Sequence, residues 1–316
     1  MPVKKILFVS LTNIGDVILT LPALDLLRER FPEAAITVVA GPRAEGIFAG
    51  NPAVAKFIPF DKRAPLPVQA GIFFGLLRER FDLVVDLRNT LFQLLGRPVK
   101  KAACGEAHSS RIHLAKAGNP PGAACPPPKS MPAKAQDNLH VDRLLAEHGI
   151  HGKGLIIVSP GARSPLKRWP KEKFSELVAF LSREIRLPVV LIGDADDRPL
   201  AEYISSEHPA VVDLAGRTTL PQLACLMTRA RVVITNDSGN LHLASYLGVP
   251  TVAVFGPTDE RRYGPWSSSN AVVKSPVGCR PCMKARCSRA HQECMERIEP
   301  FEVAQAVLSL IKPSAA

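Results

Sequence analysis

Short runs rich in β-branched residues alternate along this chain with longer stretches of helical periodicity, and this alternation limits the folds that are open to it. Such a pattern is typical of parallel sheets covered by helices. In the first half, strands are expected at Lys5–Ser10, Ala35–Ala40 and Leu83–Asp86. In the second half, they are expected at Leu155–Ser159, Pro188–Ile192, Val211–Asp213, Arg231–Thr235 and Thr251–Phe255. The sequence therefore predicts an α/β protein.

The length of the chain predicts two domains, because 316 residues exceed the size at which one hydrophobic core usually keeps growing. Helices are expected at Pro22–Phe31, Lys171–Arg186, Arg198–Glu207, Leu220–Thr228, Gly239–Leu247 and Pro300–Ile311. Residues 102–135 are rich in Pro, Gly, Ala and Lys and are expected to form a mobile loop. A helix over about 138–148 leads to a linker at Gly149–Gly154. We therefore expect domains over 1–150 and 151–316, with a ligand at the carboxyl ends of their strands.

The charge balance bears on partners and location. Lys and Arg exceed Asp and Glu by 11, which attracts nucleic acid, anionic membranes or phosphorylated substrates. Neither a zinc finger nor an aromatic RNA-recognition motif accompanies the excess, so no nucleic-acid partner is expected. No signal peptide and no membrane-spanning run is recognised in the sequence. These features predict a cytoplasmic protein that contacts the inner face of the inner membrane peripherally.

The turn after the first strand carries the first candidate for chemistry. Neither Gly-x-Gly-x-x-Gly nor Gly-x-x-x-x-Gly-Lys-Ser/Thr occurs where it would be expected, which disfavours nicotinamide dehydrogenases and P-loop phosphotransferases. Instead, Ser10–Val17 carries the chain from a strand into a helix, with Gly15 and Asp16 at the turn. Asp16 has two interpretations: it caps the helix, or it takes a proton from an acceptor hydroxyl.

The richest motif is Ile234–Ala244, where a strand ends and a helix begins. The turn itself consists of Asn236, Asp237, Ser238 and Gly239. Gly239 allows close approach of the backbone, and the N–H groups at the helix start suit a diphosphate. His242 is expected on the first turn, facing the same ligand. The alternative is that Asp237 or Ser238 caps the helix and His242 packs beside it.

Two further turns are expected at the same edge of the second sheet. Gly256–Thr258 follows the next strand, and together with the turn before it makes a plausible phosphate cradle. Ser159–Pro170 follows the first strand of the second half and carries Arg163, Lys167 and Arg168. These cations suit the charge that develops on a diphosphate as a glycosyl bond breaks. The alternative is a solvated basic loop.

Four of the seven cysteines are clustered near the C-terminus, at Cys279, Cys282, Cys287 and Cys294. Four thiols at such spacing are able to hold a structural zinc ion. A reduced, thiol-rich loop is the main alternative, and disulfides are disfavoured because a chain without a secretion signal is expected in a reducing compartment. Cys104, Cys125 and Cys225 are interpreted as incidental.

Taken together, these segments resemble the ADP-heptose:lipopolysaccharide heptosyltransferases, glycosyltransferase family 9. The resemblance is carried by Asn13–Leu24, Gly161–Pro170, Asn236–Ala244 and Phe255–Thr258, and the cysteine cluster is similar to that of many members. It implies a GT-B fold, in which two Rossmann-like domains with parallel sheets face each other across a cleft. The N-terminal domain would bind the acceptor and the C-terminal domain the nucleotide-sugar donor. The implied reaction is inverting transfer of heptose from ADP-heptose to the Kdo or heptose of the lipopolysaccharide inner core, with no cofactor and no catalytic metal.

The same resemblance implies roles for individual residues. Asp16 matches the catalytic base, Lys167 matches a contact of the donor phosphates, and Arg168 stands beside it. The remaining donor-binding candidates are Asp237, Ser238, Gly239, His242, Gly256 and Thr258, with Asp196 and Asp197 as loosely matched ribose contacts. The candidates for binding a lipid-linked acceptor are Arg43, Arg63, Arg88 and Arg111. Two alternatives stay open: a related sugar-nucleotide enzyme, such as an epimerase or a transferase of another sugar, and a non-catalytic scaffold that binds nucleotide sugars.

Overall fold

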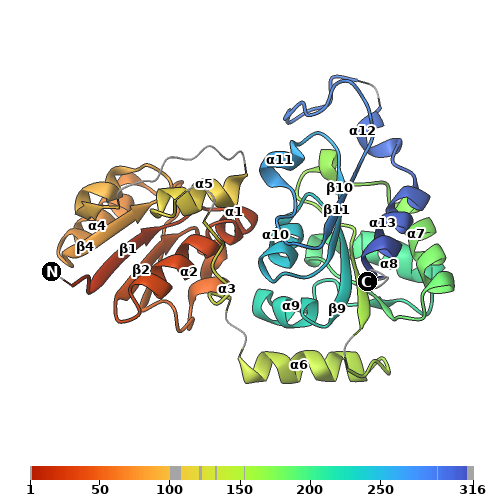
Figure 1. The fold of residues 1–316 in the computed structure, drawn as a ribbon, viewed down its shortest axis with the longest axis horizontal. Coiled ribbons are helices and arrows are strands. Elements are labelled where there is room, and N and C mark those ends of the chain that lie inside the picture. The colour runs from red at the N-terminus through yellow and green to blue at the C-terminus, as the bar shows by residue number, and fades with distance from the viewer. Residues whose placement is uncertain are drawn as a thin grey trace. The chain divides into compact units, whose positions relative to one another are not determined.

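The computed structural model describes residues 2–99, 108–120, 123–131, 134–152, 154–289 and 291–311. The chain divides into two compact units, Met1–Pro132 and Ala133–Ala316, each built on a parallel sheet covered by helices (Figure 1). This division falls before the boundary expected at 150. The reason is that helix α6 (Ala135–Ala146) packs against α9 (Leu220–Met227) of the second unit, where Asp142 also pairs with Arg229 at 3.0 Å.

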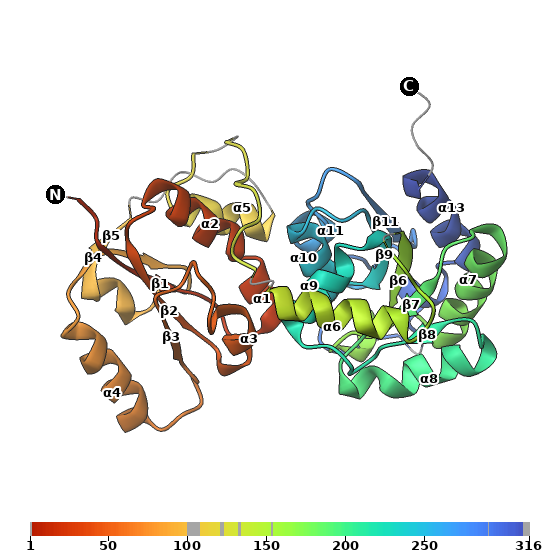
Figure 2. The ribbon, with the colours of Figure 1, turned by 90° about the horizontal axis from the view of Figure 1, so that it is seen from below.

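The first unit has five parallel strands in the order β3-β2-β1-β4-β5. They are β1 (Lys5–Val9), β2 (Ala35–Ala40), β3 (Lys56–Pro59), β4 (Phe81–Asp86) and β5 (Gly96–Pro98). The helices are α1 (Ile14–Ile18), α2 (Leu21–Arg30), α3 (Glu45–Phe48), α4 (Leu66–Leu77) and α5 (Ser109–Lys116), with 3-10 turns η1 (Pro42–Ala44) and η2 (Leu91–Leu95). Figure 2 shows α2 and α5 on one side of the strands and α4 on the other. Both faces of this sheet are therefore covered, as a buried parallel sheet requires.

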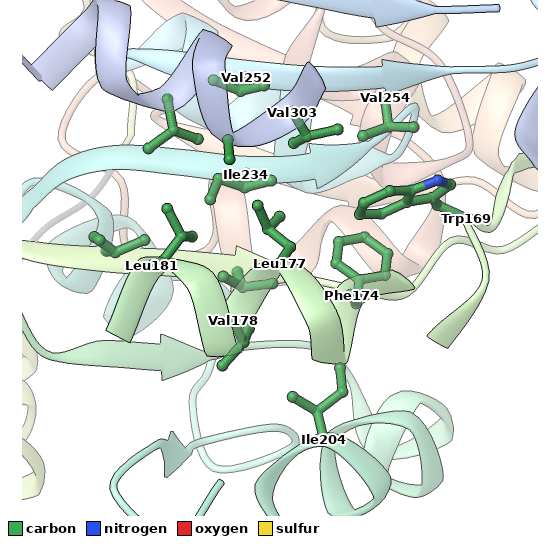
Figure 3. Close-up of a cluster of buried hydrophobic side chains, with 14 of the residues drawn as sticks. Trp169, Phe174, Leu177, Val178, Leu181, Ile204, Ile234, Val252, Val254 and Val303 are labelled. Atoms are coloured by element: carbon green, nitrogen blue, oxygen red, sulfur yellow. The ribbon is translucent and has the colours of Figure 1, made fainter. Parts of the chain in front are cut away.

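The second unit has six parallel strands in the order β11-β10-β9-β6-β7-β8. They are β6 (Leu155–Ser159), β7 (Val189–Leu191), β8 (Val212–Asp213), β9 (Ala230–Asn236), β10 (Thr251–Phe255) and β11 (Asn270–Lys274). Besides α6 and α9, its helices are α7 (Lys171–Glu184), α8 (Arg198–Glu207), α10 (Gly239–Tyr246), α11 (Glu260–Tyr263), α12 (Glu293–Glu296) and α13 (Pro300–Ile311), with 3-10 turns η3 (Pro165–Lys167) and η4 (Ala195–Asp197). Trp169 and Phe174 pack edge to face in the core beneath α7 and α13, with ring centres 4.9 Å apart (Figure 3). This core holds the strands in place and thereby positions the loops that follow their ends.

Every strand that the sequence predicted is present, with small differences at its ends. Three strands were missed: β3, β5 and β11. Helix α4 was missed as well, because Leu66–Leu77 is apolar all round and shows no helical periodicity. The expectation of a loop over 102–135 was wrong for Ser109–Lys116, which forms α5. His108 caps this helix by accepting a hydrogen bond from the backbone N–H of Ser110 at 3.3 Å.

Among the described residues, no helix combines the length and the apolar character needed to cross a bilayer.

Candidate functional site

The buried carboxylate of Asp237 joins three turns of the second unit. Its side chain is 4% exposed, and its Oδ2 lies 2.6 Å from Lys167 Nζ. The Thr258 hydroxyl donates to the same oxygen at 2.6 Å. The three residues follow β9, β6 and β10, which are neighbours in the sheet. The structure thus brings together three turns that the sequence marked separately.

Asn236 holds the loop that carries Lys167. Its side-chain amide donates to the carbonyl oxygen of Pro160 at 2.8 Å and accepts from the backbone N–H of Trp169 at 3.1 Å. The Trp169 indole in turn donates to the carbonyl oxygen of Ile298 at 3.1 Å. Both ends of the loop over 160–169 are therefore fixed to the last residue of β9.

Helix α10 begins without the side-chain cap that the alternative interpretation required. Ser238 occupies the cap position but makes no capping bond, and its hydroxyl lies 3.2 Å from that of Thr235. Asp237 is engaged by Lys167 instead. His242 is buried on this helix, with its ring 5.9 Å from that of Trp266. The backbone N–H groups at the start of α10 are thus not covered by a side-chain cap and suit an anion.

Arg168 points to a different partner from its neighbour Lys167. Its Nε donates to the carbonyl oxygen of Ala162 at 2.7 Å, and its Nη2 lies 4.0 Å from Asp197 Oδ1. Burial raises the pKa of the Asp197 carboxyl, and the nearby charge of Asp194 raises it further. A Cβ at Gly161 would lie 2.1 Å from this carboxylate, so glycine allows Asp197 to pack against the loop as it does. The structure places Asp197 against the loop, while Asp196 and Arg163 are exposed.

The turn at Gly256 has a packing role of its own. A Cβ at Gly256 would lie 2.4 Å from the sulfur of Met295, so glycine admits α12 against the end of β10. The carbonyl oxygen of Gly256 also accepts a hydrogen bond from Arg280 Nε at 2.8 Å. Packing thus gives one reason for a glycine at this turn, and the phosphate cradle stays a prediction from the sequence.

The four clustered cysteines line one cavity of about 200 Å³, which Leu166 and Pro257 connect to the turns described above. Cys294 is buried, and burial raises the pKa of its thiol, with the other three cysteines adding to the effect. All six cysteines within the described ranges are free thiols, and Cys104 lies outside those ranges. In the same ranges no three His, Cys, Asp or Glu side chains are arranged to hold a metal ion. The four thiols thus share one pocket.

Asp16 lies in the first unit, in the first turn of α1. The cap position is Asn13, so Asp16 does not cap the helix; its Oδ2 accepts a hydrogen bond from Asn13 Nδ2 at 2.9 Å. The preceding loop crosses directly over Gly41, whose Cβ, if present, would lie 2.4 Å from the Thr12 carbonyl oxygen. Gly41 also donates its backbone N–H to Leu11 at 3.1 Å. This close contact sets the position of the half-buried carboxylate.

Three of the four arginines proposed to meet an acceptor follow strand ends of the same sheet: Arg43 after β2, Arg63 after β3 and Arg88 after β4. Asp16 follows β1, and the carboxyl ends of parallel strands share one edge. The Arg88 guanidinium lies 5.7 Å from the centre of the Phe60 ring, and within the described structure its buried Nη1 has no hydrogen-bond partner. Arg111 lies on α5 and donates to the carbonyl oxygen of Ala123 at 2.8 Å.

His113 is a buried titratable residue that sequence reasoning missed. It lies on α5 and is 9% exposed. Its pKa is lowered to about 4, chiefly by burial; the charge of Lys116 and, to a smaller extent, His108 contribute, and the charge of Asp16 opposes them. A single histidine within a segment expected to be a loop gave no signal of this environment.

We expect His113 to make stability depend on pH. Because its folded pKa is below the unfolded value of 6.5, the unfolded state binds a proton first as the pH falls. The contribution is complete above about pH 6.5 and decreases toward about pH 4, by about 2 kcal/mol between about pH 7.5 and pH 5. Urea unfolding at the two pH values, for the wild type and His113→Asn, measures it. An equal pH dependence in both proteins would contradict the assignment.

Comparisons with known proteins agree with this geometry. The model of glycosyltransferase family 9 (heptosyltransferase) matches residues 108–292. Lipopolysaccharide heptosyltransferase 3 of Escherichia coli is 25% identical over 95% of this chain and 97% of its own length. Lipooligosaccharide heptosyltransferase 2 of Campylobacter jejuni is 30% identical, but the match spans 52% of this chain and only about half (53%) of that protein.

Solved structures support the fold. The ADP-heptose lipopolysaccharide heptosyltransferase II of Escherichia coli has a TM-score of 0.75 at 23% identity, covering 97% of this chain and 98% of its own. A family 9 glycosyl transferase from Veillonella parvula has a TM-score of 0.81 at 22% identity, covering 98% of both chains. The GT-B fold predicted from the sequence is confirmed by these likenesses. Because the family model covers more than half of the chain, the protein belongs to glycosyltransferase family 9, the heptosyltransferases.

Proposed function

We propose that this protein is an inverting heptosyltransferase that transfers heptose from ADP-heptose to the Kdo or heptose of the lipopolysaccharide inner core. The observation that carries the proposal is the junction of three turns at Asp237, where Lys167 and Thr258 meet at the carboxyl ends of neighbouring strands. A cation beside the start of α10 is suited to a diphosphate.

In the proposed mechanism, the donor diphosphate binds at the start of α10 and at Lys167. As the glycosyl bond breaks, negative charge grows on the departing diphosphate, and Lys167 and the backbone N–H groups stabilise it. Asp16 accepts the proton of the acceptor hydroxyl. The hydroxyl oxygen attacks the anomeric carbon from the side opposite the departing diphosphate, which inverts the configuration. Family membership and the half-buried position of the Asp16 carboxylate support these assignments.

The proposed acceptor is lipid-linked and carries phosphates and Kdo carboxylates. Arg43, Arg63 and Arg88 follow strand ends at the edge where Asp16 lies, and guanidinium groups suit both kinds of anion. The net charge of +11 favours attraction of the protein to an anionic membrane surface. We therefore propose a cytoplasmic location, with peripheral contact to the inner face of the inner membrane.

The first test is thermal unfolding with ADP, UDP, GDP, CMP or NAD, without added metal. ADP at about 100 times its Kd is expected to add about 2.7 kcal/mol of stability, which raises the Tm by several degrees. Incubation with ADP-heptose and a Kdo–lipid A acceptor, followed by mass spectrometry, then tests transfer. Stabilisation by UDP rather than ADP would contradict the donor, and ADP binding without any product would favour a non-catalytic role.

A further inference from the structure

The exposed apolar side chains of this protein are concentrated in one part of the first unit. Among the described residues, nine large hydrophobic side chains are strongly exposed, and six of them belong to α4 or η2. The six are Leu66, Val68, Phe74, Leu77, Leu91 and Leu94, and their exposed fractions run from 50% to 80%. Clustered apolar exposure of this kind marks an interaction surface.

Helix α4 is apolar on both its inner and its outer face. Leu76 is buried and Ile72 and Phe73 pack against the core of the sheet, while Phe74 is 59% exposed on the outer face. Leu66–Leu77 contains no charged residue. Its one polar side chain, Gln69, donates to the carbonyl oxygen of Ala64 at 2.7 Å in the preceding loop. A surface helix of a water-soluble domain normally has a polar outer face, so the outer face of α4 requires another explanation.

The 3-10 turn η2 extends this surface. The ring of Phe92 lies 5.8 Å from that of Phe73, which places η2 beside α4. Phe92 and Leu95 point into the shared core, whereas Leu91 and Leu94 are 70% and 69% exposed. The two elements thus present their outer apolar side chains next to each other.

Positive charge flanks α4 at both ends. Lys62 and Arg63 precede the helix, Arg78 and Arg80 follow it, and all four side chains are exposed. Of the adjacent acids, Glu79 pairs with Lys56 at 2.5 Å, and Asp61 accepts the backbone N–H of Arg63. An apolar face flanked by cations is complementary to an anionic bilayer, whose acyl boundary takes the apolar groups and whose phosphates meet the cations.

We propose that the outer faces of α4 and η2 form a docking surface that holds the first unit on an anionic lipid bilayer. The inference rests on the proposed function in one respect, because a lipid-linked acceptor has to be reached at a bilayer. Helix α4 begins after β3, at the carboxyl edge of the sheet where Asp16 also lies. Docking through this helix therefore brings the acceptor edge of the unit toward the headgroups.

The test uses the full-length protein and flotation with vesicles that contain no acceptor, made of phosphatidylcholine alone or with about a quarter phosphatidylglycerol. The wild type is expected to float with the anionic vesicles. Phe74→Ser combined with Leu91→Ser is expected to weaken binding about tenfold or more. Lys62→Gln combined with Arg78→Gln should weaken binding to the anionic vesicles and reduce its sensitivity to salt, because two of the four flanking cations are removed. Phe301→Ser is the matched control, because Phe301 is 60% exposed on α13 of the second unit, and it should bind like the wild type.

Three results would overturn the docking surface: a wild type that does not float with anionic vesicles, a Phe74/Leu91 serine variant that floats as the wild type does, or a wild-type dimer that this variant converts to a monomer. The last result would assign the surface to a second copy of the chain. Unchanged circular dichroism and Tm show that each variant folds. Transfer to a water-soluble, delipidated acceptor should be unchanged in the serine variant. Vesicle binding without any transfer by the wild type would count against the proposed function and leave the docking surface standing.

Discussion

Replacing Asp16 by Asn is expected to lower the rate of heptose transfer by about 10²–10⁴-fold, the usual contribution of a general base. The amide keeps the shape of the side chain and its place beside Asn13, but it does not accept the acceptor's proton. Donor binding should be unaffected, because the donor turns belong to the second unit. Initial rates of ADP release, with the product identified by mass spectrometry, give the size of the loss.

Asp82→Asn is the matched control for this variant. Asp82 lies near the amino end of β4, where its carboxylate accepts hydrogen bonds from the backbone N–H groups of Lys4 and Lys5 at 2.9 Å. It is therefore at the opposite edge of the sheet from Asp16, and its replacement should leave the rate unchanged. A wild-type rate in Asp16→Asn would remove Asp16 as the base, and a loss of stabilisation by ADP in that variant would point to a folding defect instead.

Replacing Lys167 by Met is expected to have two separable effects. The rate should fall by about 10²–10³-fold, because the departing diphosphate loses a positioned cation. The free energy of unfolding should also fall, because the buried Asp237 carboxylate loses its partner. Since Lys167 is 30% exposed and the pair is partly screened, we expect a decrease of about 1–3 kcal/mol. Urea unfolding and initial transfer rates measure the two effects on one preparation.

The double variant Lys167→Met/Asp237→Asn separates stability from catalysis. It removes the uncompensated charge of Asp237, so most of the lost free energy of unfolding should return while the transfer rate stays low. Lys171→Met is the control, because Lys171 lies 4.1 Å from the centre of the Tyr203 ring, outside the proposed site, and its loss should leave the rate unchanged. Recovery of the rate in the double variant would mean that Lys167 serves only as the counter-ion of Asp237.

The sequence predicted the buried strands well because each is a short apolar run that ends in turn residues. Leu155–Ser159 and Thr251–Phe255 were located to the residue. The prediction failed for segments that lack the contrast between an apolar run and its flanking turn residues. Strand β5 is Gly96-Arg97-Pro98, with no apolar run, and α4 is apolar all round. The division between the units was misplaced because the helical periodicity of α6 does not indicate which core the helix joins.

The sequence was sufficient to place Lys167, Asp237 and Thr258 at one edge of the second sheet, because each follows a predicted strand and parallel strands end at one edge. It did not show that β6 and β9 are neighbours in that sheet, because two other strands separate them along the chain. The sequence could not show that Lys167 pairs with Asp237 while Arg168 turns toward Asp197, because side-chain direction depends on the path of the loop. The burial of His113 beside α2 and near Asp16 also depends on contacts between distant segments, for which residue type gives no signal.

The amide of Asn236 has a consequence for the energetics of donor recognition. Because it binds Pro160 and Trp169 at opposite ends of the Lys167 loop, the loop keeps its course before any nucleotide arrives. Ordering a free loop on binding would consume about 0.5–1.5 kcal/mol for each immobilised side chain, in addition to the backbone entropy. The conformational entropy of this loop was already lost when the second unit folded. Ordering of the loop therefore subtracts little from the binding free energy that an incoming diphosphate gains through its contacts.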